Sequence, residues 1–176
     1  MTAETLFPSV LGADFAALDP CLRRVHSGQP CKLHGSVTVE RGTGWASRVL
    51  GSLASLPSAM KDATIEVKIE RTNRGERWIR VFAGQHRMTS TLHEDRELLV
   101  EQLGPAALKF RLSVRAGEMR WVLEHISMFG IALPLGWFRI AATINSRDGR
   151  YHFLVDSHLR GVGRIARYEG LIDVDD

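Results

Sequence analysis

The sequence predicts an α+β fold that is mainly β. The expected architecture is a long, curved antiparallel meander of roughly eight to nine strands that forms an open or half-closed barrel. From residue 63 onward, apolar and polar residues alternate with a period of two, which is typical of strands with one buried and one wet face. Short turn signals such as Asp148-Gly149 separate the alternating segments. Because strands twist, a long sheet that is wet on one face curls on itself.

The chain begins with a predicted helical segment, residues 1–30, ahead of a sheet that spans residues 31–176 of a single domain, 1–176. A short helix is expected to start at Asp19-Pro20, because Asp can cap a helix and Pro fits its first position. Leu22 and Val25 are its expected inward residues. A first strand follows over residues 32–40.

Residues 45–56 form the best predicted helix, inserted between the first strand and the rest of the sheet. Trp45 and Val49 lie at helical spacing, Arg48 is the only charged residue, and Pro57 ends the helix. A helix with so little charge is either well covered or meets an apolar surface. We expect it to pack across the concave face or the mouth of the sheet.

The most regular stretch is a hairpin in residues 107–126. Apolar residues alternate with charged or polar ones on both sides of Ala116-Gly117, the expected two-residue loop. The resulting register sets apolar residues opposite apolar ones and opposite charges against each other. Its expected pairs are Phe110 with Leu123, Leu112 with Trp121, Val114 with Met119, Lys109 with Glu124, and Arg115 with Glu118. The same register places His125 on the apolar face, opposite Leu108.

The residues after this hairpin form an apolar connection that contains the charge-free sequence MFGIALPLGWF. A second hairpin over residues 140–158 and a last strand over residues 165–174 complete the sheet. The Trp45 helix and the Ile131–Phe138 loop together carry more apolar residues than two connections usually do. They either plug the barrel and complete its core or line a pocket for a lipid, a membrane or a protein. The sequence leaves both readings open.

Composition excludes several classes of protein. The 176 residues carry a formal net charge of +3, and no block of like charges suggests nucleic-acid binding. The N-terminus lacks the pattern of a signal peptide, and no apolar run is long enough to span a membrane. Two cysteines are too few for a disulfide scaffold, so we expect a protein of the reducing cytoplasm.

Three groups of residues suggest chemistry, and each also has a structural explanation. Arg41-Gly42-Thr43-Gly44 lies between a strand and a helix, where an anion can bind or the glycines can simply turn the chain. His152, Asp156 and His158 share one strand face, which suits a general base or a solvated polar surface. Cysteines and histidines with zinc-like chemistry, in a spacing that is not that of a known finger, occur at Cys21, His26, Cys31 and His34. We expect no metal site there.

Two further residues are predicted to point toward the interior. Arg80 shares its strand face with Trp78 and Phe82, so its charge needs a partner such as Glu101 or Tyr168, or else a ligand carboxylate. A structural ion pair is the preferred explanation. His125 is a histidine of the core or rim, with an acid–base role as the alternative.

Short motifs along the chain resemble those of a known bacterial family. The resemblance rests on motifs in order along nearly the whole chain: Val39-Glu40-Arg41-Gly42-x-Gly44, Pro57, Glu76-x-Trp78-x-Arg80-x-Phe82-x-Gly84, Ser90, Glu101-x-x-Gly104-Pro105, Gly130-x-x-Leu133-Pro134, Gly163 and Tyr168-x-Gly170. They resemble the family catalogued as domain of unknown function 4166, which implies no established activity. Some members resemble C-terminal additions to a saccharopine-dehydrogenase-like domain, and this chain is expected to stand alone without one. Cys21, Cys31 and the histidines are not part of the family pattern.

The preferred hypothesis is a non-enzymatic domain that binds an apolar or amphipathic small molecule in a curved-sheet cavity, without a cofactor. The predicted ligand-binding residues are Arg41, Trp45, Trp78, Arg80, Glu101, Phe110, Trp121, His125 and Tyr168. A second hypothesis is an accessory domain that binds an oxidoreductase through an exposed Ile131–Phe138 loop. A third is an enzyme that uses His125, or Arg80 with Glu101, as acid–base groups.

Overall fold

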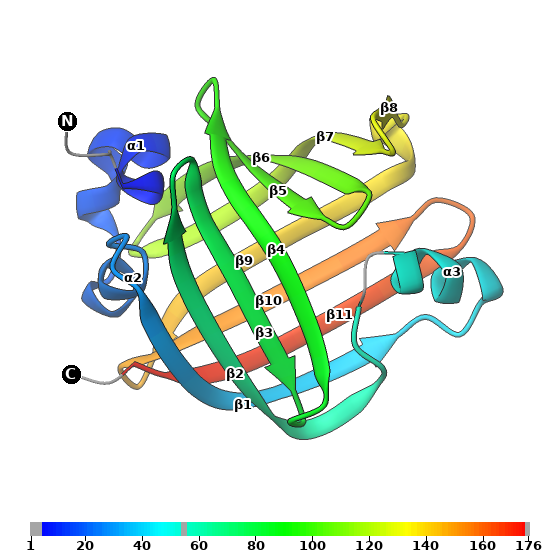
Figure 1. Ribbon diagram of the computed structural model, residues 1–176, viewed down its shortest axis with the longest axis horizontal. Coiled ribbons are helices and arrows are strands. Elements are labelled where there is room, and N and C mark those ends of the chain that lie inside the picture. Colours follow the sequence, from blue (N-terminus) through cyan, green and yellow to red (C-terminus); the bar gives the residue numbers. More distant parts are fainter. Residues whose placement is uncertain (1–4, 54–55, 175–176) are drawn as a thin grey trace.

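The computed structural model, which describes residues 5–53 and 56–174, is a closed antiparallel barrel of ten strands with one extra short strand (Figure 1). The barrel strands are neighbours in chain order, so the barrel is an up-and-down meander that the pairing of β1 with β11 closes. The strands are β1 (Cys31–Arg41), β2 (Met60–Thr72), β3 (Gly75–Phe82), β4 (His86–Asp95), β5 (Leu98–Leu103), β6 (Ala106–Arg115), β7 (Glu118–Met128), β8 (Ile131–Ala132), β9 (Phe138–Arg147), β10 (Arg150–Leu159) and β11 (Gly163–Asp173).

The fold is mainly β and antiparallel, as the sequence predicts, but two finer expectations differ from the structure. The described residues form eleven strands instead of eight to nine, and the barrel is neither open nor half-closed. Its ends meet along eight residue pairs, from His34 opposite Asp173 to Arg41 opposite Ala166. The two paired strands are separated by most of the chain in sequence, so no local sequence pattern predicts their contact.

The hairpin of β6 and β7 has the predicted loop, because Ala116 and Gly117 both adopt the positive φ that a tight two-residue turn requires. The predicted pairs Phe110–Leu123, Leu112–Trp121, Val114–Met119 and Arg115–Glu118 are confirmed.

The placement of His125 on the apolar face is wrong. A β-bulge between Lys109 and Phe110 shifts the register, so His125 lies opposite Lys109, and Ile126 takes the inward position opposite Leu108. The side chain of His125 is exposed. The predicted pair of Lys109 and Glu124 is also absent. Lys109 donates instead to Asp95, and Glu124 pairs with Arg111.

The N-terminal residues plug one end of the barrel (Figure 1). Helix α1 (Leu6–Leu11) is followed by the 3-10 helix η1 (Gly12–Ala17) and helix α2 (Pro20–Val25), whose cap is Asp19 as predicted. Phe7 is fully buried, and its ring lies 4.0 Å from His26 and 5.9 Å from Trp121, centroid to centroid. The N-terminal helices, with the buried Phe7 ring, therefore close this end of the barrel interior.

The opposite end of the barrel, called the mouth here, carries the longer connections (Figure 1). Helix α3 (Trp45–Leu53) joins β1 to β2, and β8 with the 3-10 helix η2 (Leu135–Trp137) joins β7 to β9. The helix predicted over residues 45–56 is thus confirmed up to Leu53, residues 54–55 lie outside the described part of the chain, and Leu56 is not helical. The helix packs at the mouth, against β11. No helix in the described segments has both the length and the apolar character that crossing a bilayer requires.

Replacing Phe7 by Ala should lower the free energy of unfolding by about 3–5 kcal/mol, because the plug would lose a fully buried ring. Urea denaturation measures the change. The matched control is Phe129→Ala at an exposed ring on the mouth, which should change stability by less than about 0.5 kcal/mol. Equal losses in the two variants would contradict the plug.

Candidate functional site

The barrel encloses a cavity of about 170 Å³. Its lining consists mainly of aliphatic and aromatic side chains from β2 to β11, including Trp78, Phe110 and Trp121 near the plug. Leu56, Met128 and Phe138 line it near the mouth. An apolar cavity of this kind favours apolar ligands, because water inside it would find few partners.

One charged pair lies within this apolar lining. Arg80 on β3 and Glu101 on β5 both line the cavity, and the Arg80 Nη2 atom lies 3.2 Å from Glu101 Oε1. Ser90 on the intervening strand β4 accepts a second hydrogen bond, 3.0 Å long, from Arg80 Nη1. The two charged side chains are only 15% and 11% exposed. The predicted ion pair is therefore confirmed, and its low exposure makes loss of one partner costly.

Aromatic groups complete this polar cluster. The guanidinium carbon of Arg80 lies 5.1 Å from the centroid of the Trp78 ring, a cation–π distance. Tyr168 also lines the cavity. Burial raises the pKa of Tyr168 to about 12, and the Glu101 carboxylate acts in the same direction. Its phenol therefore stays protonated near neutral pH and can donate a hydrogen bond, so Arg80, Glu101 and Tyr168 together offer a cation, an anion and a neutral donor.

A second polar contact lies under the plug, and the sequence did not predict it. His26 is fully buried, and its Nε2 atom lies 3.1 Å from the Tyr151 hydroxyl. Burial lowers the pKa of His26 to about 3, so the imidazole is neutral at ordinary pH. Tyr151 lines the cavity, which makes this pair the link between plug and cavity. His26 and Tyr151 are 125 positions apart in the chain, so no sequence spacing could have joined them.

Glu76 is a further interior residue that the sequence analysis named only as part of a motif. It is 2% exposed and accepts a 2.8 Å hydrogen bond from Trp78 Nε1. Burial raises the pKa of its carboxyl group. Glu76 is separated from Trp78, Arg80 and Phe82 by even numbers of residues on β3, and this spacing could have placed it on the inner face.

Three predicted ligand-binding residues do not line the cavity. Arg41 donates to the backbone carbonyls of Ser47, Leu56 and Pro57, so its guanidinium fastens α3 and the chain that follows it. Trp45 is 79% exposed, and His125 lies outside the barrel. The others, Trp78, Arg80, Glu101, Phe110, Trp121 and Tyr168, all line the cavity.

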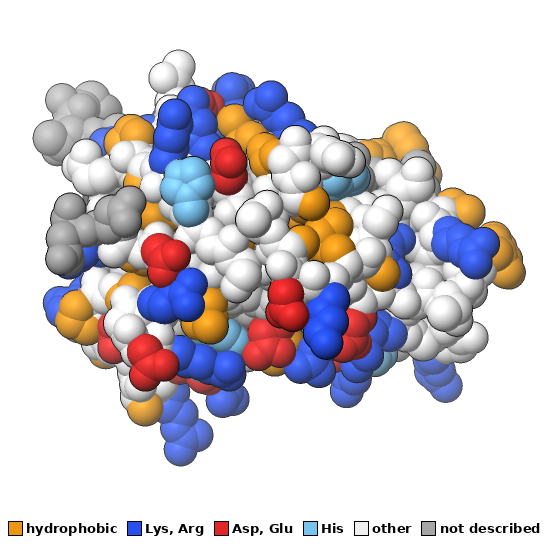
Figure 2. Space-filling view, turned by 90° about the horizontal axis from the view of Figure 1, so that it is seen from below, with side chains coloured by type: hydrophobic (Ala, Val, Ile, Leu, Met, Phe, Trp, Pro, Cys, Tyr) orange, Lys and Arg blue, Asp and Glu red, His pale blue; other side chains and the backbone are white. Residues whose placement is uncertain are grey.

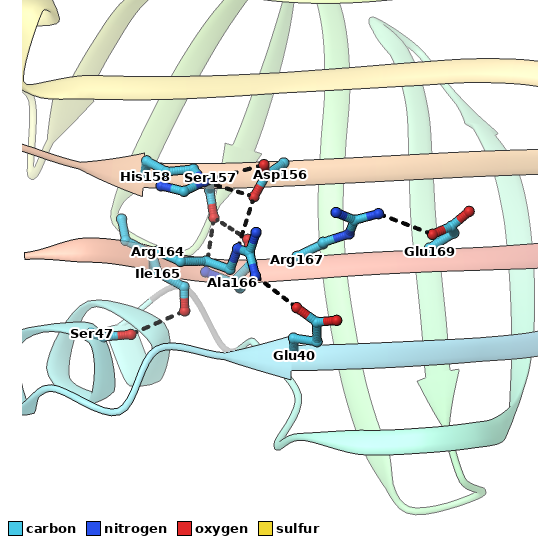
Figure 3. A network of polar contacts seen from close by, with 10 residues as sticks. All are labelled: Glu40, Ser47, Asp156, Ser157, His158, Arg164, Ile165, Ala166, Arg167 and Glu169. Atoms are coloured by element: carbon cyan, nitrogen blue, oxygen red, sulfur yellow. Dashed lines mark hydrogen bonds and ion pairs between the residues drawn. The ribbon is translucent and has the colours of Figure 1, made fainter.

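The polar face of β10 forms part of a network on the outer wall (Figure 3). Asp156 contacts both His158 and Arg164, and Arg164 also pairs with Glu40 on β1. Ser157 points the other way, lines the cavity and donates to the Ala166 carbonyl. Because the serine and the His158–Asp156 pair lie on opposite faces, they cannot act together as a nucleophile and its base.

His152 also belongs to the outer face. It is only 2% exposed, so the expectation of a solvated polar surface does not hold for this residue. Its ring is held between Asn145 and Glu169, at 3.0 and 2.9 Å. The zinc-like residues do not converge either: His26 faces Tyr151, whereas His34 is exposed on β1. Across residues 5–53 and 56–174, no group of three or more His, Cys, Asp or Glu side chains is arranged to hold a metal ion.

Sequence comparison identifies a family for most of the chain. The model described as "Domain of unknown function (DUF4166)" matches residues 18–172, which include all of the barrel except Asp173, the last residue of β11. No curated protein matches the chain. The family description names no activity, so the function has to be argued from the site.

Replacing Arg80 by Met should lower the free energy of unfolding by about 3–5 kcal/mol, because Glu101 would remain in the interior without its cation. The double variant Arg80→Met/Glu101→Leu should regain most of this loss, since no unpaired charge remains. Chemical denaturation of both variants measures the difference. A double variant as unstable as Arg80→Met would show that the charges are not coupled.

Lowering the pH from about 6.5 toward 3 should destabilise the protein, because the unfolded chain protonates His26 below about 6.5. The folded protein does so only near 3, and therefore binds fewer protons in this range. The contribution of His26 to stability should decrease by up to about 1.4 kcal/mol per pH unit. His26→Leu should flatten the stability profile across this range, and His34→Leu, which removes an exposed histidine, is the matched control.

Proposed function

The chain belongs to the DUF4166 family, and we propose that its barrel is a non-enzymatic domain that binds an apolar or amphipathic small molecule. The observation that carries the proposal is the apolar cavity with the Arg80–Glu101 pair in its lining. Ligand sites are typically apolar pockets in which a few polar groups fix orientation. The barrel interior has this composition.

The cluster of Arg80, Glu101 and Tyr168 suits a ligand with one polar group. Arg80 donates to Ser90 and Glu101, and a guanidinium has further N–H groups that can bind a carboxylate or a hydroxyl. The protonated phenol of Tyr168 adds a donor. The apolar part of the ligand would contact the aromatic wall formed by Phe110 and Trp121, whose ring centroids are 5.6 Å apart. This arrangement suits a short apolar molecule with a polar end.

The accessory-domain hypothesis has one supporting observation. Ile131 and Trp137 in the β7–β9 connection are 69% and 55% exposed, so the predicted apolar loop is available to a partner. A tight complex with an oxidoreductase in pull-down experiments, lost in Trp137→Ser, would favour this function. The enzyme hypothesis now depends on Arg80 and Glu101 alone, because His125 lies outside the barrel.

Filling the cavity should abolish ligand binding without unfolding the protein. Ala142 lines the cavity on β9, opposite Trp121, so Ala142→Leu projects new atoms into it. We expect at least about tenfold weaker binding of the fluorescent probe anilinonaphthalene sulfonate, because overpacking a site costs about 1–3 kcal/mol. Native mass spectrometry of gently purified protein should show a co-purifying lipid-like mass that this variant lacks.

The matched control is Ala107→Leu, which adds the same atoms to β6 at a residue between the inward Ala106 and Leu108 and outside the cavity lining. It should bind the probe as the unmodified protein does. Absence of both a co-purifying mass and probe binding in the unmodified protein would remove the proposal.

A further inference from the structure

The mouth of the barrel concentrates exposed apolar side chains. Of the large hydrophobic residues exposed in the described part of the chain, all but Val122 lie in α3, in the β7–β9 connection or in the β10–β11 turn. Trp45 and Phe129 are the most exposed, at 79% and 71%. In an up-and-down barrel these three connections share one end. Exposed apolar surface of this extent marks an interaction site.

Helix α3 exposes two large apolar side chains of the kind that a surface helix usually buries. Ser47 is fully buried and donates to the Ile165 carbonyl at 3.0 Å, and Gly51, one turn later, packs against the Arg41 guanidinium. Trp45 and Val49, also one turn apart, face solvent. A surface helix normally buries its apolar face. Among the described residues of this helix, the small Ser47 and Gly51 face the barrel, whereas the apolar Trp45 and Val49 point outward.

The charge at the mouth has a single sign. The five connections at this end, residues 42–59, 83–85, 104–105, 129–137 and 160–162, contain no Asp or Glu. Arg48 and Arg160 lie within them. Both are exposed, and within the described residues neither side chain has a partner. Figure 2 shows the same asymmetry on one face, where acidic side chains lie away from the end that carries α3.

We propose that the mouth docks onto a bilayer that contains anionic lipids. Tryptophan and other apolar side chains insert between headgroups, while flanking arginines attract the negative surface. The mouth combines both features around the end of the cavity lined by Leu56, Met128 and Phe138. The core of a protein interface is usually depleted of charge and its rim is polar, whereas the connections at the mouth carry exposed arginines beside apolar side chains and no carboxylate.

Docking in this orientation would set the mouth end of the cavity against the lipid, so that an apolar ligand could pass between bilayer and barrel without crossing water. This consequence rests on the proposed function, whereas the docking surface itself rests only on the mouth. The two can therefore be tested separately.

Sedimentation with vesicles tests the docking surface. The protein should sediment with vesicles of phosphatidylcholine mixed with an equal part of phosphatidylglycerol, and much less with phosphatidylcholine alone. Arg48→Gln/Arg160→Gln should weaken the partition coefficient about 25-fold, about fivefold for each arginine. Trp45→Ser should weaken it at least about tenfold, through lost apolar burial.

The matched controls lie away from the mouth. Val122→Ser removes an exposed apolar side chain from the outer wall, and Arg74→Gln/Arg96→Gln removes two exposed arginines near turns of the plugged end. Both should sediment nearly as the unmodified protein does. The cavity-filled variant Ala142→Leu should also sediment normally while losing probe binding, which separates docking from ligand binding.

Three results would overturn the proposal: no sedimentation with either kind of vesicle, equal loss in the mouth variants and their controls, or self-association through the mouth. The last would appear as a dimer in size-exclusion chromatography that Trp45→Ser dissociates and that vesicles do not disrupt.

Discussion

The pairing of β1 with β11 is the contact on which the rest of the structure depends. It leaves no free barrel edge and fixes an even number of strands, because neighbours in an antiparallel ring must alternate in direction. The alternation sends every second connection to the same end. The β6–β7 turn and the N-terminal plug therefore share one end, while α3 and the β7–β9 connection share the other. Closure thus creates both an interior and two ends of different character.

The cavity lining is mainly apolar, and the charged pair within it is informative. A buried ion pair such as Arg80 with Glu101 often gives no more stability than two apolar side chains of similar size. Stability alone therefore does not explain a guanidinium and a carboxylate in an apolar cavity, together with the donor of Tyr168. A ligand with a polar end would explain them, since it needs a fixed point of attachment. The neutral His26–Tyr151 pair, by contrast, lies against the plug and has the character of a structural contact.

What the sequence could predict was local. Strict alternation and the Ala116-Gly117 turn fixed the register of Phe110 with Leu123, and Asp19 marked its helix start. One extra residue at the bulge was enough to carry His125 from the predicted inner face to the outside, and alternation cannot reveal such a shift. The inward Arg80 was recognisable because it shares its face with Trp78, but the distant partner of His26 was not. Long-range closure left no local signal either.

Helix α3 shows that a helical spacing of apolar residues can predict secondary structure correctly without predicting which residues are buried. The spacing of Trp45 and Val49 correctly predicts a helix, yet the usual inference that such residues face inward fails for these two. The reason is steric and polar: Gly51 leaves room for the Arg41 guanidinium, and Ser47 bonds to β11, so the small face fits the barrel. A chain that buries a serine and exposes a tryptophan on one short helix loses stability in water. Contact with an apolar surface outside the molecule would recover this lost stability. The same burial of apolar surface that stabilises the barrel would then also drive docking at the mouth.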